Sequence, residues 1–314
     1  MVSQKFDIVL VGHISKDKNV VDGKERNVLG GAVYYGAFPL KAMGFNIAII
    51  TKLAKEDFSE LSVFERAGIP VFAREAPQTT GIKNLYSTEH PDERQSYPLG
   101  FAGPFSEENF PNVDAKIIHI GALRRGEVSL KMIQKLSRMG DVNLDAQGFV
   151  RVKEDNRLVL RDWDKKSIAL PYIKYLKADL VETQVLTGIS DLSIAAKSLA
   201  KMGASEILIT HKKGVLLFAK GELYRAPFRP KSLKGRTGRG DTCISTYIGK
   251  RLTLPPYKAL CFAAALTTLK LEKEGPFRGK LEDVEILSKK FEMNERIRRR
   301  KERSCSAVKY DETE

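Results

Sequence analysis

The residues best suited to chemistry lie in one short run, Thr237-Gly238-Arg239-Gly240-Asp241. Two glycines let the backbone turn tightly, so successive N–H groups can point at one place. Residues 244–252 read as a helix, which would add the positive end of its dipole there. This pattern predicts an anion hole suited to phosphate, with the Asp241 carboxylate at its mouth. An aspartate in a first helical turn can also act only as a cap, and the run alone leaves that alternative open.

The run differs from the two common phosphate-binding motifs. No Gly-Lys-Ser/Thr ends a glycine-rich loop, as a Walker loop requires. Gly238 and Gly240 lack the third glycine and the immediately preceding strand of the dinucleotide fingerprint. A nicotinamide-dependent oxidoreductase is therefore disfavoured.

The elements that would position this run alternate in type along the chain. Short apolar stretches typical of buried strands are separated by stretches with helical patterning. The expected strands are residues 6–11, 46–51, 116–120, 142–144, 179–181 and 207–210, and the expected helices are 32–43, 127–136, 163–175 and 192–202. The alternation predicts an α/β fold in which helices cover both faces of a mainly parallel sheet.

Two segments interrupt the alternation, residues 14–30 and 79–100. The first is polar and charged, and the second carries β-formers around a turn-like centre. Together they could build a small sheet that projects from the main domain and acts as a lid. Farther along, residues 215–218 and 222–226 flank Lys220-Gly221 and are expected to form a hairpin.

Composition narrows the class of protein. The chain has 314 residues with 42% hydrophobic content, enough for a sizeable core. No apolar run approaches the roughly 20 residues of a membrane-spanning helix, and we expect a soluble cytoplasmic protein. Cys243, Cys261 and Cys305 are expected to be reduced thiols. The cysteines and the four histidines lack the spacing of a transition-metal site.

The formal net charge of +14 is unevenly distributed. Residues 289–303 hold eight basic side chains against three acidic ones, so we divide the chain into a domain of residues 1–288 and a basic helix and tail of residues 289–314. A solvated terminal helix is favoured, because Phe291 is the one aromatic residue there that could stack on a base. A nucleic-acid-binding protein that uses this tail is the alternative from another class.

Taken together, these positions resemble the ribokinase-like (PfkB-type) carbohydrate kinases, over nearly the whole chain to about residue 280. The motifs that carry the resemblance stand in the family's order: residues 12–17, Gly30-Gly31, Asp179-Leu180-Val181-Glu182 in place of Asn-x-x-Glu, Thr210 with Gly214, and Gly238-Arg239-Gly240-Asp241. The resemblance implies a three-layer α/β/α domain with a small β-sheet lid. It also implies transfer of the γ-phosphoryl group of MgATP to an alcohol.

The resemblance implies a role for most residues of these motifs. Asp241 would be the catalytic base, and Gly238, Arg239 and Gly240 would form the anion hole. Asp17, Gly30 and Gly31 would bind substrate. Thr210, Gly214, Arg236 and Thr237 would bind the nucleotide, and Glu182 (through water) with Asp179 would serve magnesium. Asp145 and Arg151 follow a predicted strand, where open α/β sheets place ligands, so they are substrate or phosphate candidates, with a surface salt bridge as the alternative.

The chain departs from the family's Asp-Thr-x-Gly-Ala-Gly-Asp motif. Gly235 stands where the family's first aspartate helps to bind an activating monovalent cation, which puts potassium dependence in doubt. Arg236 and Arg239 are additional, and we hypothesise that one of them supplies a fixed positive charge near the phosphates. A solvent-facing loop is the alternative for both.

The acceptor is less well defined by the sequence than the reaction. A neutral sugar or cyclic polyol, inositol included, ranks first, because the segment around Asp17 and Asn27 is polar. A nucleoside ranks second, and a phosphosugar third. The expected cofactors are ATP and Mg²⁺, and the expected state is a monomer or a homodimer that contacts neither membrane nor nucleic acid.

Overall fold

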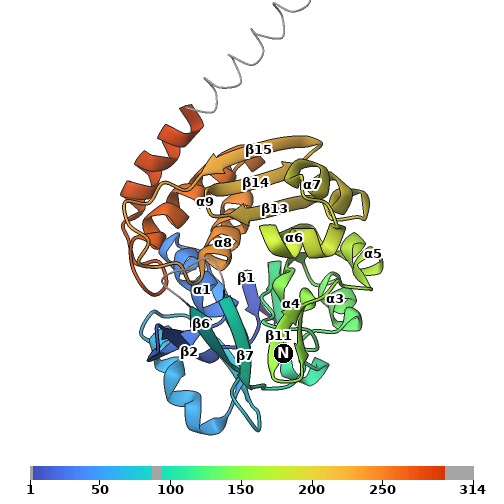
Figure 1. The fold of residues 1–314 in the computed structure, drawn as a ribbon, viewed down its shortest axis with the longest axis vertical. Coiled ribbons are helices and arrows are strands. Elements are labelled where there is room, and N and C mark those ends of the chain that lie inside the picture. The colour runs from blue at the N-terminus through green and yellow to red at the C-terminus, as the bar shows by residue number, and fades with distance from the viewer. Residues whose placement is uncertain (1–2, 87–93, 294–314) are drawn as a thin grey trace, which may run out of the picture.

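The computed structural model describes residues 3–86 and 94–293. Its main feature is a nine-stranded sheet in the order β15-β14-β13-β12-β9-β8-β1-β4-β5, parallel from β13 to β5 and antiparallel from β13 to β15 (Figure 1). These strands are β1 (Gln4–Val11), β4 (Ile47–Leu53), β5 (Val71–Glu75), β8 (Val113–Ile120), β9 (Asp141–Asp145), β12 (Tyr175–Asp179), β13 (Glu206–His211), β14 (Gly214–Ala219) and β15 (Glu222–Pro227). The α/β class with a mainly parallel sheet and the hairpin of β14 and β15 are confirmed.

Helices cover both faces of this sheet because its strands are apolar on both sides. Ile8 and Leu10 of β1 face one hydrophobic cluster, and Val9 and Val11 face the other. The first face is covered by α1 (Ala32–Ala42), α2 (Ser62–Glu65), α8 (Arg239–Arg251), α9 (Pro256–Leu271) and helical residues 281–293. The second face is covered by α3 (Leu130–Leu136), α4 (Gln147–Val150), α5 (Lys166–Ala169), α6 (Leu180–Thr187) and α7 (Leu192–Lys201). Short 3₁₀ helices are η1 (Lys55–Leu61), η2 (Glu107–Asn109) and η3 (Leu170–Tyr172).

A second, four-stranded sheet lies below α1 in Figure 1. Its order is β3-β2-β6-β7, and its strands are β2 (Ser15–Val21), β3 (Lys24–Gly30), β6 (Gly81–Tyr86) and β7 (Arg94–Gly100). It is thus built from the two segments that interrupt the α/β alternation. Beside β7 lies a hairpin that the sequence analysis did not predict, β10 (Arg151–Glu154) with β11 (Arg157–Leu160).

Three expected elements were wrong in type or extent. Residues 179–181 are not a strand, because Asp179 ends β12 and caps α6 through its side chain. Residues 163–175 do not form one helix, because α5 ends at Ala169, the 3₁₀ turn η3 with Pro171 follows, and β12 begins at Tyr175. The helix expected from residue 127 starts later, at Leu130, after its cap Ser129.

The basic tail is described only at its beginning. Residues 289–293 continue a helix, and Phe291 is 3% exposed within the core. Residues 294–314, which hold most of the basic side chains behind the nucleic-acid alternative, lie outside the described residues.

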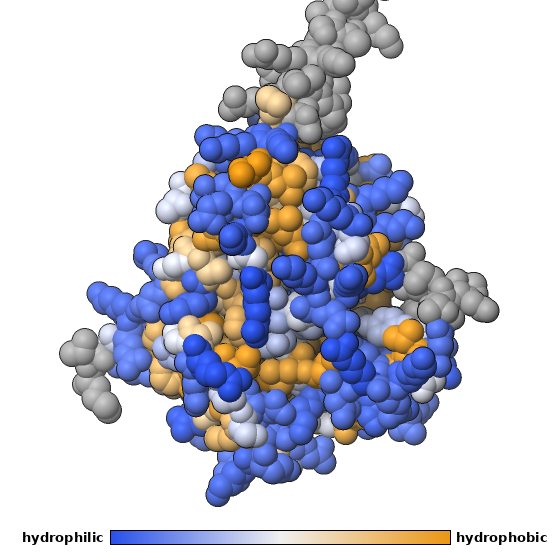
Figure 2. Space-filling model, turned by 90° about the vertical axis from the view of Figure 1, so that its left-hand side faces the viewer, coloured by the Kyte–Doolittle hydropathy of each residue, from blue (hydrophilic) through white to orange (hydrophobic). Residues whose placement is uncertain are grey.

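Within the described part of the chain, no helix combines the length and the apolar character needed to cross a bilayer. Figure 2 shows one face of the molecule, where hydrophilic side chains cover most of the surface and apolar ones gather in a band between them.

Candidate active site

The predicted anion hole is the N-terminus of α8. Gly238 is the N-cap, with a left-handed φ of 77°, and Asp241 lies in the first turn. A Cβ atom on Gly238 would lie 2.1 Å from Cδ1 of the Tyr35 ring, so both the backbone conformation and the space require glycine. The first N–H groups of a helix have no acceptor within it, which makes a helix start a site for anions. Here the N–H of Arg239 makes a long hydrogen bond of 3.4 Å to the carbonyl oxygen of Arg236 in the preceding turn.

A buried lysine that the sequence analysis missed stands in front of this helix end. Lys177, on β12, is 4% exposed, and its Nζ lies 3.1 Å from Oδ1 of Asp145 and 3.4 Å from Oε2 of Glu182. A Cβ atom on Gly240 would lie 2.8 Å from Cε of Lys177. Glycine at position 240 therefore lets the helix end approach the lysine, and β9, β12, α6 and α8 meet at one place.

The charges of this cluster act on one another strongly. Burial opposes the charge of Lys177, but the surrounding carboxylates, Asp145 and Glu182 first among them, raise its pKa above the ordinary value. Burial raises the pKa of Glu182 to about 7 against the pull of Lys177. Burial also raises the pKa of Asp241, while the positive charges of Lys177, Lys270 and Arg151 lower it. The Asp241 carboxylate is thus basic for an aspartate and is surrounded by cations.

Two predicted residues, Asp145 and Arg151, meet at this cluster. Oδ2 of Asp145 is buried and has no hydrogen-bond partner among the described residues. Arg151 is 6% exposed; its guanidinium donates to Oε1 of Gln147 at 2.8 Å and to the carbonyl oxygen of Leu123 at 3.3 Å. The surface salt bridge is therefore the wrong alternative for both residues.

The predicted metal-side pair forms a capping box. The Asp179 side chain accepts from the N–H of Glu182 at 2.8 Å, and Glu182 accepts from the N–H of Asp179 at 2.7 Å. The described residues contain no group of three or more histidine, cysteine, aspartate or glutamate side chains that could hold a metal ion. The cluster nevertheless fits Mg²⁺, which keeps several waters and binds phosphates. Water on the ion could donate to Glu182 and to the unpartnered oxygen of Asp145.

The other predicted substrate residues, Asp17, Gly30 and Gly31, lie where the small sheet meets the start of α1. Oδ1 of Asp17 accepts from the N–H of Ile82 in the small sheet at 3.0 Å, and a Cβ on Gly30 would lie 2.4 Å from Oδ2 of Asp17. Gly31 has a φ of 101° and approaches the carbonyl oxygen of His13. Burial raises the pKa of Tyr35, and the charges of Asp241 and Asp17 add to that shift. Asp17 and Asp241 therefore both lie near the same ring.

A row of polar side chains crosses the small sheet beside Asp17, and the sequence analysis missed it. Nδ2 of Asn84 donates to Oδ1 of Asn19 at 3.2 Å, and the Ser96 hydroxyl donates to Oδ1 of Asn84 at 2.8 Å. Asn84 is 7% and Ser96 8% exposed. Amides and hydroxyls both donate and accept, so such a row suits a hydroxyl-rich ligand.

Of the residues expected to bind the nucleotide, two lie on buried strands and two lie in an exposed loop. Thr210 is buried near the end of β13, on the α8 side, whereas Gly214 begins β14, where a Cβ would lie 2.4 Å from the carbonyl oxygen of Ala226 in β15. Arg236 and Thr237 are exposed in the loop before α8.

Positive charge gathers beside the hairpin of β13 and β14. Burial lowers the pKa of His211, and three cations, Arg239, Arg225 and Lys213, lower it further. We refer to Lys213, Arg225 and Arg239, whose charges all act on the neutral His211 imidazole, as the cationic cluster. Arg239 is the first residue of α8 and borders the anion hole, whereas Arg225 donates to the Ser193 hydroxyl of α7 at 2.7 Å.

A buried carboxylate holds the segment that leads to Asp17. Glu127 is fully buried and accepts from the N–H of His13 at 3.0 Å and from that of Leu123 at 2.8 Å. Ile14 donates its N–H to Thr51 Oγ1 at 3.0 Å. Burial raises the pKa of Glu127 to about 7. The chain that leaves β1 is thus fixed by side chains from distant segments.

Glu127 should make stability fall as pH rises. Its folded-state pKa of about 7 exceeds the ordinary 4.5, so its contribution is complete below pH 4.5 and is lost as pH rises through 7. The free energy of unfolding of the wild type minus that of Glu127→Gln should decrease by about 3 kcal/mol across this window, from 1.36 kcal/mol per pKa unit. Urea unfolding at several pH values measures the difference. A difference that is constant with pH would contradict the assignment.

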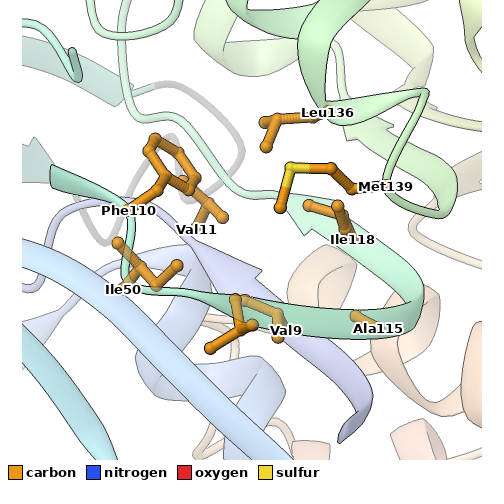
Figure 3. A pocket seen from close by; sticks show the side chains of 9 residues that line it. Val9, Val11, Ile50, Phe110, Ala115, Ile118, Leu136 and Met139 are labelled. Atoms are coloured by element: carbon orange, nitrogen blue, oxygen red, sulfur yellow. The ribbon is translucent and has the colours of Figure 1, made fainter. Parts of the chain in front are cut away.

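The pocket in Figure 3 is separate from this polar site. It is lined by Val9, Val11, Ile50, Phe110, Val113, Ala115, Ile118, Leu136 and Met139. Val9, Val11 and Ile118 belong to the sheet face covered by α3, which is opposite to α8. Its lining is wholly apolar, so it offers nothing to bind a phosphate or a hydroxyl.

Comparison with known proteins adds to this picture. No family model matches the chain. A solved structure described as a pyrophosphate-dependent kinase in the ribokinase family, in complex with sulfate, is 40% identical, with a TM-score of 0.83, and the alignment covers 88% of this chain and 99% of that one. Another, of a pyrophosphate-dependent kinase in that family with a pyrophosphate analogue and myo-inositol, is 39% identical, with a TM-score of 0.83, and the alignment covers 89% of this chain and 99% of that one. A cytidine kinase from Thermococcus kodakarensis is 27% identical over 256 residues, 77% of this chain and 87% of that protein.

Proposed function

Because this chain belongs to the ribokinase family, and is thus a phosphotransferase that acts on a hydroxyl group, we propose that it phosphorylates a small cyclic polyol of the inositol type with pyrophosphate as the donor. The observation that carries the proposal is the position of Arg239 at the first residue of α8, directly after the left-handed Gly238, with the other cations of the cationic cluster acting on the nearby His211. Pyrophosphate is small and highly charged, so it needs cations along its whole length. The sequence analysis expected MgATP, which remains the alternative donor.

The donor would lie between the α8 N-terminus and the cationic cluster. Guanidinium groups stay protonated and bind phosphate oxygens in a fork, which suits Arg239 at the start of α8. Arg236, in the exposed loop just before α8, would add a second guanidinium to the same oxygens. The relatives described as pyrophosphate-dependent, at 39% and 40% identity, support this choice over ATP.

The acceptor would lie between Asp17 and Asp241. Asp17 and the polar row of Asn19, Asn84 and Ser96 offer hydrogen bonds to several hydroxyls of one ring. Gly30 and Gly31 allow the backbone to approach closely. The myo-inositol bound in one relative supports a cyclic polyol. The small sheet would close over the acceptor as a lid and exclude water.

The reaction would need one proton transfer by the protein. Asp241 accepts the proton of the attacking hydroxyl, whose oxygen bonds to the nearer phosphorus while the bond from that phosphorus to the bridging oxygen breaks. Inorganic phosphate leaves with the bridging oxygen. The N–H groups at the start of α8 and the Lys177 ammonium stabilise the negative charge on the transferred group. Magnesium, when bound through donor oxygens and water near Glu182 and Asp179, neutralises further charge.

A nucleoside acceptor is the second candidate, since the cytidine kinase is a relative. A base needs an aromatic face on which to stack. Tyr34, Tyr35 and Phe38 are each 9% exposed or less, and the Arg124 guanidinium lies 3.7 Å above the ring of Phe101. These rings are therefore occupied by the protein's own packing, which favours the polyol.

The donor can be identified by direct competition. Purified protein with Mg²⁺ is offered pyrophosphate or ATP together with myo-inositol, ribose or cytidine, and ³¹P NMR identifies the products. We expect an inositol phosphate and inorganic phosphate from pyrophosphate, with kcat/KM at least tenfold above that with ATP. Turnover with ATP alone would overturn the donor assignment, and phosphorylation of cytidine alone would overturn the acceptor assignment.

One arginine variant connects that result to the cationic cluster. Arg239→Ala should raise the KM for pyrophosphate about 10- to 100-fold, the usual effect of losing a hydrogen bond to a charged group. Arg66→Ala, which removes an exposed arginine just after α2, is the matched control. Unchanged kinetics in Arg239→Ala would remove that residue from the donor site.

A further inference from the structure

One buried ammonium group lies directly behind the anion-hole loop. Lys270, in the last turn of α9, is 2% exposed. Its Nζ donates to the carbonyl oxygen of Gly235 at 2.6 Å and to that of Thr237, and it lies 5.1 Å from the centroid of the Tyr35 ring. Both of these hydrogen bonds go to backbone carbonyls of a single loop.

The loop is pressed against the end of α9 at this point. Gly235 donates its N–H to the carbonyl oxygen of Leu271 at 2.8 Å. A Cβ atom on Gly235 would lie 1.8 Å from the carbonyl oxygen of Lys273 and 2.8 Å from that of Lys270. The carbonyl groups of Gly235 and Thr237 and the C-terminus of α9, which is the negative end of its dipole, thus surround one small space. The Lys270 ammonium occupies that space.

The Lys270 ammonium affects the anion hole by orienting the peptide group between Thr237 and Gly238. In a trans peptide the C=O and the following N–H point in opposite directions. Because the Thr237 carbonyl points toward Lys270, the N–H of Gly238, at the N-cap of α8, points away from it. Burial lowers the pKa of Lys270 to about 8 and the Asp241 carboxylate raises it, so the group is charged at neutral pH.

We propose that Lys270 is a covalently tethered monovalent cation of the anion hole, which orients the loop carbonyls and thereby the N–H groups that receive the transferred phosphoryl group. It is a positioning residue, because its ammonium contacts the loop and not the substrate. The inference rests on the proposed function in that it assigns phosphoryl transfer to α8. It implies that turnover needs no added potassium or ammonium ion.

Removal of the side chain provides the test. Lys270→Ala leaves a space lined by carbonyl oxygens, which K⁺ or NH₄⁺ could enter, because both resemble the lysine ammonium in charge and size. Lys270→Met fills the same space with an uncharged chain and is the matched control. Lys273→Ala removes an exposed lysine three residues away and controls for loss of surface charge.

Turnover is measured with pyrophosphate and myo-inositol at constant ionic strength, in tetramethylammonium chloride or with K⁺ or NH₄⁺ added. The wild type and Lys273→Ala should be unaffected by the cation. Lys270→Ala should lose about 10- to 100-fold in kcat in tetramethylammonium, with little change in KM, and should regain most of the loss with K⁺ or NH₄⁺ in a saturable way. Lys270→Met should lose as much and regain none.

Several results would overturn the proposal. A wild type that requires K⁺ would show that the tethered ammonium does not serve as the cation. Full activity of Lys270→Ala without K⁺, or a loss that no cation restores, would reduce Lys270 to a structural residue. If Lys270→Ala does not fold, the cation dependence of the wild type alone still decides.

The midpoint of thermal unfolding gives a readout that needs no turnover. K⁺ and NH₄⁺ should raise the Tm of Lys270→Ala relative to tetramethylammonium, and should leave the Tm of the wild type and of Lys270→Met unchanged. If the protein turns over none of the offered substrates, the proposed function fails while this cation-dependent Tm still tests the role of Lys270. A Tm of Lys270→Ala that does not respond to either ion would contradict it.

Discussion

Asp241→Asn should lower kcat about a thousandfold, because general-base catalysis contributes roughly 10²- to 10⁴-fold and no other carboxylate shares the first turn of α8. Asparagine keeps the shape of the side chain and its preference for helix N-termini. The KM values for both substrates should change by no more than a few fold. Steady-state kinetics with pyrophosphate and myo-inositol measure the effect, with circular dichroism to confirm the fold.

The matched control is Asp191→Asn, which alters the N-cap of α7, where asparagine caps equally well. It should keep wild-type kinetics.

The pH dependence of kcat/KM provides a second test of Asp241. Burial raises the pKa of Asp241, so kcat/KM of the wild type should fall with acid at a higher pH than for an ordinary aspartate. This acid limb should be absent from the residual activity of Asp241→Asn. Near-normal turnover in the variant would remove Asp241 from the role of base.

The sequence predicted the glycine turn and the start of α8 well because their determinants are local. Two glycines and an aspartate at the start of a helix specify a backbone conformation within five residues, and the structure places Gly238 at the left-handed N-cap of α8. The parallel sheet was predictable for a similar reason, since hydrophobic runs and helical patterning alternate in the chain itself. The roles of these residues in catalysis stay predictions.

The roles of the two buried lysines, Lys177 and Lys270, could not be predicted from the sequence. Lys177 interrupts the apolar strand Tyr175-Leu176-Lys177-Ala178, and Lys270 interrupts an apolar helix. A lysine in such a setting must have partners, which was a usable signal. The partners come from β9, α6 and the loop before α8, and no local pattern identifies them. The position of each ammonium group therefore required the tertiary structure.

The polar row of the small sheet was hidden for a different reason. Asn19, Asn84 and Ser96 are brought together by strand register, with Asn19 opposite Asn84 and Asn84 opposite Ser96. A shift of one residue would turn each side chain to the other face. Segments 14–30 and 79–100 could be predicted to form a sheet, but their register could not be predicted.

Lys177→Met should destabilise the protein by about 3–5 kcal/mol, the usual cost of removing one partner of a buried ion pair. Asp145 and Glu182 are 1% and 3% exposed, so both carboxyl groups would lose their buried cation. Methionine nearly preserves the volume, which separates the loss of charge from the loss of packing. Urea unfolding at pH 8 measures the difference from the wild type.

Lys174→Met is the matched control, because Lys174 directly precedes β12, the strand that carries Lys177. Its ion pair with Asp141 is short, at 2.5 Å, but the two side chains are 40% and 45% exposed. Exposed pairs contribute about 0–1 kcal/mol, so this variant should be nearly as stable as the wild type. Equal losses in the two variants would contradict the special position of Lys177.

Two further measurements should show that Lys177→Met loses stability because the Asp145 and Glu182 carboxylates lose their cation. Without the ammonium group, the folded-state pKa values of Asp145 and Glu182 rise further, and a carboxyl group with a raised pKa loses its stabilising contribution as pH rises. The gap between wild type and Lys177→Met should therefore be smaller at pH 5 than at pH 8. Adding Asp145→Asn should recover part of the loss, because one of the two unpaired charges is then absent. A gap that does not change with pH, together with no recovery in the double variant, would show that packing around the side chain, and not its charge, is what the cluster requires.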